Sequence, residues 1–245
     1  MAMARRIVRV TGKDALTFLQ GMVSNDVLPL SKGPGLVWAA LLTPQGKYLA
    51  DFFVANTGTD LLIDLPEGMA DSTLQRLGMY RLRADVQMTP TQMAVRRGLG
   101  APPEGALPDP RHPDMGWRAY GLAGEDTVDW DAIRVRHLIP ESGIELIPGE
   151  SYLLETGFDR LHGVDFRKGC YVGQEVTARM KHKTELRKGL MRVKVSEPVP
   201  VGTPILAEGK EAGTLYTQAG GEGIAYLRFD RSAGPLMAGP AEVTA

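Results

Sequence analysis

The sequence contains a single cysteine, Cys170, among its 245 residues. One thiol excludes an intramolecular disulfide and fits a reducing compartment. It also excludes an iron–sulfur cluster held by this chain alone, because such a cluster usually needs four thiolate or mixed thiolate and histidine ligands. The four histidines show no metal-ligand spacing, so we expect no metal site; they are His112, His137, His162 and His182.

Long apolar runs are also missing from the chain. No stretch of 18 apolar residues occurs, and residues 1–6 lack the apolar core of a signal peptide. We therefore expect a protein without membrane contact, and the cytoplasm is the location that these absences predict.

Charge of one sign is not in excess, since the net charge is −1 and the isoelectric point is about 6.4. No global basic field is therefore available for tight, direct binding to nucleic acid. Six basic residues nevertheless gather after residue 178: Arg179, Lys181, Lys183, Arg187, Lys188 and Arg192. This run is interpreted either as a basic stripe or as a solvated helix end and loop.

Apolar periodicity in the first 97 residues switches between strand and helix. Helices are expected near residues 15–22 and from residue 66 onward. Strands are expected near residues 7–10, 36–42, 47–54, 61–65, 82–86 and 93–95. The segment Thr43-Pro44-Gln45-Gly46 favours a type I turn between two paired strands. Hairpins mixed with helices indicate an α+β fold and not a regular βαβ series.

Glycine and proline are frequent in the rest of the chain and mark its turns and loops. Residues 98–116 are rich in both and are predicted to form an exposed loop between two lobes. A helix is expected over residues 130–138, followed by an ordered crossing segment over 141–165. Short strands after residue 187 predict a small antiparallel barrel or sandwich. We therefore divide the chain into an N-terminal α+β lobe, a second α+β lobe and a C-terminal β-barrel, at residues 1–97, 98–187 and 188–245.

The segment Asp165–Glu175 surrounds the cysteine. Gly169 and Gly173 let the backbone turn sharply and approach a ligand closely. Residues 174–181 are predicted to form a helix, so Cys170 lies just before a helix N-terminus and beside Lys168. Both features favour the thiolate. A free cysteine is also commonly a small buried hydrophobe, and the two interpretations stay open.

The run Lys168-Gly169-Cys170-Tyr171-x-Gly173-Gln174-Glu175 resembles the signature of the YgfZ-type folate-binding proteins. These are relatives of the aminomethyltransferase (T-protein) of the glycine cleavage system. Residues 12–26, the hairpin at 42–47 and the C-terminal β module follow in the order found in that group, so the resemblance covers nearly the whole chain. It implies an aminomethyltransferase-like α+β fold, with a ring of lobes around a folate channel and a C-terminal antiparallel β-barrel.

The resemblance also implies that tetrahydrofolate or a derivative is the cofactor. A flat pterin needs an aromatic or apolar wall with a carboxylate or amide at its edge, and the glutamate tail of folate needs arginine or lysine. The candidate folate-binding residues are Asn25, Asp26, Arg83, Trp130, Arg134, Lys168, Gly169, Tyr171, Gly173, Gln174 and Glu175. Plain structural roles are open alternatives: turn chemistry for Asn25 and Asp26, core packing for Trp130, surface charge for the cations, and helix capping for Gln174 and Glu175.

The cysteine-bearing motif is similar to that of the branch associated with iron–sulfur enzyme maturation. It implies a non-enzymatic, folate-binding accessory protein for iron–sulfur cluster assembly or repair. Cys170 would be its reactive thiol, and iron–sulfur assembly proteins or client enzymes would be its partners.

Two other functions are weighed against this one. The first is a folate-dependent aminomethyltransferase or demethylase that transfers a one-carbon unit to tetrahydrofolate, with Asp51 or Glu175 as the acid/base group. The paired aspartate of such enzymes is replaced here by Ala50-Asp51. The second is a role tied to tRNA modification, although near-neutral charge argues against tight, direct RNA binding.

Overall fold

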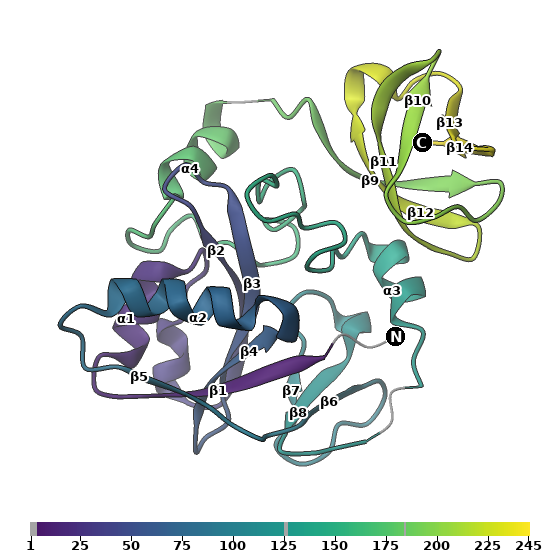
Figure 1. The fold of residues 1–245 in the computed structure, drawn as a ribbon. Coiled ribbons are helices and arrows are strands. Elements are labelled where there is room, and N and C mark those ends of the chain that lie inside the picture. The colour runs from purple at the N-terminus through teal and green to yellow at the C-terminus, as the bar shows by residue number, and fades with distance from the viewer. Residues whose placement is uncertain (1–3, 125–126, 184) are drawn as a thin grey trace.

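The computed structural model describes residues 4–124, 127–183 and 185–245. The first part of the chain is built on one antiparallel sheet with the strand order β2-β3-β4-β1-β5. Its strands are β1 (Arg5–Thr11), β2 (Gly35–Leu42), β3 (Tyr48–Asn56), β4 (Leu61–Pro66) and β5 (Gln87–Pro90). Helices α1 (Ala15–Met22) and α2 (Glu67–Arg81) pack on one face of this sheet, and the 3-10 helix η1 (Leu28–Lys32) lies between α1 and β2 (Figure 1).

The part of the chain from residue 95 to residue 183 follows the large sheet in sequence. It contains β6 (Val95–Gly98), β7 (Leu107–Pro108), the 3-10 helix η2 (Pro113–Met115), β8 (Trp117–Tyr120), α3 (Trp130–His137) and α4 (Gln174–Lys183). The three strands form a sheet in the order β6-β8-β7. Between α3 and α4 the chain runs through successive turns that bury Leu153, Phe158 and Leu161, so the crossing segment is ordered, as the sequence predicts. None of the helices in the described part of the chain could cross a lipid bilayer.

Period-two alternation gives the large sheet two apolar faces. Leu41 and Val54 point toward α1 and α2 and belong to the first core. Trp38 and Phe53 point the other way and join a second core with residues of the crossing segment. Both faces of β2 and β3 are therefore buried, which explains why these strands are nearly continuous runs of apolar residues.

The last part of the chain is a closed barrel with the strand order β10-β11-β12-β9-β14-β13. Its elements are β9 (Lys188–Val195), β10 (Thr203–Ala207), β11 (Lys210–Ala219), β12 (Glu222–Arg228), the 3-10 helix η3 (Phe229–Arg231), β13 (Leu236–Ala238) and β14 (Ala241–Thr244). The barrel has its own apolar core and stands beside α3 (Figure 1). The expected combination of an α+β body with a C-terminal antiparallel β-barrel is confirmed.

Two local predictions are wrong. Residues 82–86 form a turn instead of a strand, because two hydrogen bonds join Asp85 to Asp14. The Asp14 backbone amide donates to the Asp85 carbonyl oxygen, and the Asp14 carboxylate accepts from the Asp85 backbone amide. Residues 98–116 are not one exposed loop. They include β7 and η2, and they bury the ion pair between Asp109 and Arg111 at 2.8 Å. Pairing of these charges allows a segment rich in proline and glycine to enter the interior.

The division of the chain at residues 97 and 187 stays a prediction. The first boundary does not separate two cores, since Ile7 and Leu62 of the large sheet pack in one buried cluster with Leu107.

Candidate functional site

Cys170 is exposed at the surface of the molecule, four residues before the first residue of α4. It opens onto a surface pocket of about 350 Å³ that runs along α4. The pocket is lined by Asp165, Phe166, Lys168, Gly169, Cys170, Tyr171, Gln174, Glu175, Ala178 and His182. The interpretation of Cys170 as a small buried hydrophobe is therefore wrong, and the sulfur is open to a partner.

Lys168 anchors the cysteine-bearing loop to α1. Its Nζ atom donates to the backbone carbonyl oxygens of Gln20 (2.7 Å), Asn25 (2.9 Å) and Val23. Two of these carbonyls lie at the C-terminal end of α1, where the helix dipole favours a cation. Burial lowers the pKa of Lys168 to about 8, although the nearby carboxylates of Asp26 and Asp165 raise it in part. The Lys168 ammonium group therefore donates its hydrogen bonds to backbone carbonyl oxygens of its own chain.

The turn at residues 24–26 supports the same loop. The Ser24 hydroxyl donates to the Gly163 carbonyl oxygen at 2.6 Å, and the Asn25 amide donates to the His162 carbonyl oxygen at 2.7 Å. The carboxylate of Asp26 accepts from the Leu28 amide at 3.1 Å. The structure therefore brings Asn25 and Asp26 next to Lys168, and their side chains make turn and loop contacts within the chain.

Gly173 and Gly169 have different roles in the loop. Gly173 has φ +84°, and a Cβ atom there would lie 2.5 Å from the Thr43 carbonyl oxygen. The close approach that the sequence predicts at Gly173 is thus to the chain's own hairpin turn at 43–46. Gly169 has open space around it, with no atom within 4 Å of a Cβ position.

Gln174 and Tyr171 join the loop to the start of α4. The Gln174 Oε1 atom accepts from the Tyr171 backbone amide at 3.1 Å. This bond ties the loop to the first residue of α4. Burial raises the pKa of Tyr171 to about 12, and its ring lies 4.9 Å from Lys168 Nζ. Glu175 is exposed on the pocket wall. The candidates from Lys168 to Glu175 therefore form one cluster with Cys170.

The remaining candidates lie outside this cluster. Trp130 is 6% exposed within the second core, and the guanidinium of Arg97 lies 4.3 Å from its ring centre. Arg134 is buried and bonded to Asp131 and Glu145, so its charge is matched inside the chain. Arg83 is exposed just beyond the end of α2. Contact of any of these side chains with folate stays a prediction.

Asp51 is buried on the second-core side of β3 and is 5% exposed. Its carboxylate accepts from Tyr48 Oη at 2.6 Å, Ser142 Oγ at 2.5 Å and Trp38 Nε1 at 2.8 Å. Burial, with the Asp51 charge and hydrogen bond, raises the pKa of Tyr48 well above its ordinary value, so the phenol keeps its proton as a donor. Three neutral donors thus enclose this carboxylate.

Comparison with known proteins gives matches over nearly the whole chain. Mitochondrial iron–sulfur cluster assembly factor IBA57 of mouse is 31% identical over 95% of this chain and 78% of its own length, and that of human is 30% identical over the same shares. This chain belongs to the IBA57 family of iron–sulfur cluster assembly factors. A homologue from Mycosarcoma maydis is 32% identical over 76% of this chain. The match spans about half (54%) of the length of that relative.

Two further matches concern the fold. Residues 187–245 match the family model of the CAF17 C-terminal beta-barrel domain. The glycine cleavage system aminomethyltransferase T from Bartonella henselae has a TM-score of 0.73 and 12% identity, covering 98% of this chain and 81% of that one. The predicted aminomethyltransferase-like fold is confirmed. Within the superfamily, the family shown is IBA57, and a closer relation to the YgfZ-type group stays a prediction.

The relatives correct the expected location. The curated IBA57 proteins named above are mitochondrial, which contradicts the cytoplasmic prediction. That prediction used cysteine content and the lack of an apolar signal. Low cysteine content separates reducing from oxidising compartments, but not one reducing compartment from another. An apolar signal marks only the secretory route, because mitochondrial targeting segments are amphipathic and rich in arginine.

Sequence reasoning missed one cluster that could hold a metal ion. His112, Asp114 and His137 place their ligand atoms within 4.8 Å of one another. The two rings stack at 3.7 Å, His112 Nδ1 accepts from the Asp114 amide, and His137 Nε2 lies 2.7 Å from the Asp114 carboxylate. His137 Nε2 and the Asp114 carboxylate already contact each other, so a metal held by this pair would have to replace that contact. No spacing signal could reveal the cluster, since η2 and the end of α3 meet only in the fold.

Proposed function

We propose that this chain is a folate-binding accessory factor for iron–sulfur cluster assembly or repair, in which Cys170 is an exchangeable ligand of the cluster. The observation that carries the proposal is the exposed thiol at the edge of a pocket, in a chain of the IBA57 family. The cluster is cargo, and the iron–sulfur assembly protein or client enzyme that delivers or receives it supplies the other ligands.

A single thiol suits transfer better than storage. One thiolate cannot hold a cluster that needs four ligands, so the chain binds it only while a partner contributes the rest. The thiol gives up its proton as the iron–sulfur bond forms, and regains one when the partner takes the cluster back. An exposed position lets both events occur without unfolding the loop that Lys168 anchors.

Replacing Cys170 by serine tests the thiol. In cells that lack the chain, Cys170→Ser is expected to restore the activity of iron–sulfur enzymes about tenfold less well than the wild type, or worse. The reason is that losing a direct ligand should cost at least as much as losing an outer-shell partner of a metal site, which is about 10–100-fold. The melting temperature of the purified variant is the control and should be unchanged, because the side chain is exposed. Full restoration by the serine variant would remove the thiol from the mechanism.

The folate part of the proposal is supported by the aminomethyltransferase-like fold, with Trp130 as the predicted folate contact. Titration with tetrahydrofolate is expected to change tryptophan fluorescence to saturation. The chain has three tryptophans, so the reporter can be identified by replacement. Trp130→Phe should lose most of the change, whereas Trp117→Phe should keep it. Absence of both a fluorescence change and binding heat at millimolar tetrahydrofolate would contradict folate binding.

One-carbon transfer, the alternative function, gains no support from Asp51. A general acid or base must reach the proton that it moves. The Asp51 carboxylate is buried and surrounded by the hydroxyls of Tyr48 and Ser142 and the indole of Trp38. We therefore propose no transferase activity through Asp51, and a transferase role for Glu175 and the link to tRNA modification stay predictions.

A further inference from the structure

Basic residues are concentrated in one segment of the chain. Residues 167–192 contain eight lysines and arginines against two glutamates, so this segment carries a charge of +6. The remaining residues carry −7, which gives the total of −1. A nearly neutral protein thus holds a strongly basic segment that begins beside Cys170.

Helix α4 arranges this charge beside the cysteine pocket. Gln174, Ala178 and His182 follow one another at four-residue spacing and line the pocket. Side chains four residues apart lie on the same face of a helix. Arg179 and Lys183 are each one residue further along, so they form a parallel row on the neighbouring face, and both are exposed.

Glu175 begins the same row four residues before Arg179, but no ion pair joins the two in the described part of the chain. Lys181 pairs with Asp159 at 3.1 Å, but within the described residues no ion pair involves Arg179, Lys183 or Arg187. By contrast, the arginines of β1 face Asp64, Glu67 and Asp60. The dipole of α4 accounts for basic residues in its last turn, but not for Arg179 or for Arg187 beyond the helix.

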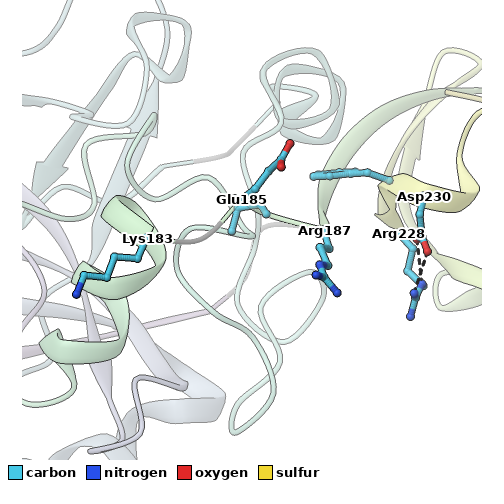
Figure 2. Close-up of a pocket in the computed structure, with 7 residues that line it drawn as sticks. Lys183, Glu185, Arg187, Arg228 and Asp230 are labelled. Carbon is cyan, nitrogen blue, oxygen red and sulfur yellow. Dashed lines mark hydrogen bonds and ion pairs between the residues drawn. The ribbon is translucent and has the colours of Figure 1, made fainter.

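The positive charge continues from α4 toward the barrel. Figure 2 shows that the guanidinium groups of Arg187 and Arg228 point the same way and that Glu185 points the opposite way, whereas Lys183 extends from the end of α4 away from these residues. These residues border a second surface pocket of about 550 Å³. Arg228 is paired with Asp230 at 3.0 Å, so Lys183 and Arg187 are the unmatched cations here.

We infer that the exposed cations Arg179, Lys181, Lys183 and Arg187, which we call the α4 basic surface, dock an acidic protein partner that carries the iron–sulfur cluster to Cys170. This inference rests on the proposed function and names the chemistry of its partner. Charge complementarity would guide the partner and fix its orientation, so that its cluster meets the thiol at the edge of the pocket. Nucleic acid is the competing polyanion, and its binding is an outcome of the test.

The first test measures binding to two defined polyanions. A fluorescent twelve-residue polyglutamate peptide and a twelve-nucleotide RNA are titrated with the full chain at low ionic strength. The wild type should bind the peptide, and Arg179→Glu/Lys183→Glu should bind it about tenfold or more weakly, since like charges now oppose it. The matched control is Lys13→Glu/Lys210→Glu, which reverses two exposed cations outside the α4 basic surface and should bind as the wild type does. Equal peptide binding by all three chains, or tighter binding of RNA than of peptide, would overturn the inference.

The second test separates this inference from the proposed function. In cells lacking the chain, iron–sulfur enzyme activity is compared for Cys170→Ser, Arg179→Glu/Lys183→Glu and the control pair. If enzyme activity falls with both the serine variant and the α4 reversal, but not with the control pair, docking at this surface is supported. Loss with the serine variant alone overturns the docking surface and leaves the role of the thiol intact. Retention with the serine variant overturns the proposed function itself.

Discussion

Replacing Arg134 by methionine is expected to lower the free energy of unfolding by about 3–5 kcal/mol, the cost of removing one partner from a buried ion pair. Arg134 is 2% exposed, and its guanidinium is bonded to Glu145 and, at 3.1 Å, to the Ile139 carbonyl oxygen. Methionine fills much of the volume but leaves the Glu145 carboxylate without its cation. The loss therefore comes from an uncompensated charge and not from a cavity.

The effect should spread to the barrel. The Glu145 carboxylate also accepts from the hydroxyl and the amide of Thr217, at 2.5 and 3.2 Å, so Arg134 and Glu145 together join α3 to β11. Chemical denaturation of Arg134→Met should show the loss, and amide exchange should increase at Thr217. Arg136→Met is the matched control, because Arg136 lies on the same helix with an exposed side chain, and its stability should change by about 0.5 kcal/mol at most. Equal stability of the two variants would mean that the buried pair contributes nothing.

Replacing Gly173 by alanine is expected to cost about 2–5 kcal/mol, which combines the strain of a left-handed residue with that of overpacking. The φ angle at Gly173 is +84°, and an added Cβ would lie 2.5 Å from the Thr43 carbonyl oxygen and 2.9 Å from Leu42 Cβ. Neither contact can be relieved by turning a flexible side chain. The loop that carries Cys170 would have to move away from the hairpin turn at 43–46.

Gly169→Ala provides the control within the same motif. No atom lies within 4 Å of its Cβ position, so the melting temperature should stay within a few degrees of the wild-type value. Thermal unfolding monitored by circular dichroism distinguishes the two variants. The prediction for Gly173 fails if both alanine variants melt together. A loss of iron–sulfur enzyme activity in Gly169→Ala at unchanged stability would instead indicate that a partner approaches the backbone there.

Local patterns were sufficient for much of the fold. The apolar run at 36–42 and the strand expected at 47–54, with the turn residues between them, predicted the hairpin of β2 and β3. The spacing in 174–181 predicted α4, and the short strands after residue 187 predicted the barrel. Each of these signals depends on neighbours a few residues apart, which the order of the chain fixes directly. The turn at 82–86 escaped prediction because Asp14, 71 residues from Asp85, decides its conformation.

For the candidate site, the sequence by itself determined that one thiol lies ahead of a helix start between two glycines, in a motif typical of this superfamily. Only the tertiary structure decided that Lys168 turns to the carbonyls of α1, that Asp51 is enclosed by three donors and that Cys170 faces solvent. Burial and hydrogen-bond partners come from segments distant in the chain, and residue types alone do not fix them. The sequence supplied the reactive groups, and packing settled which of them a partner can reach.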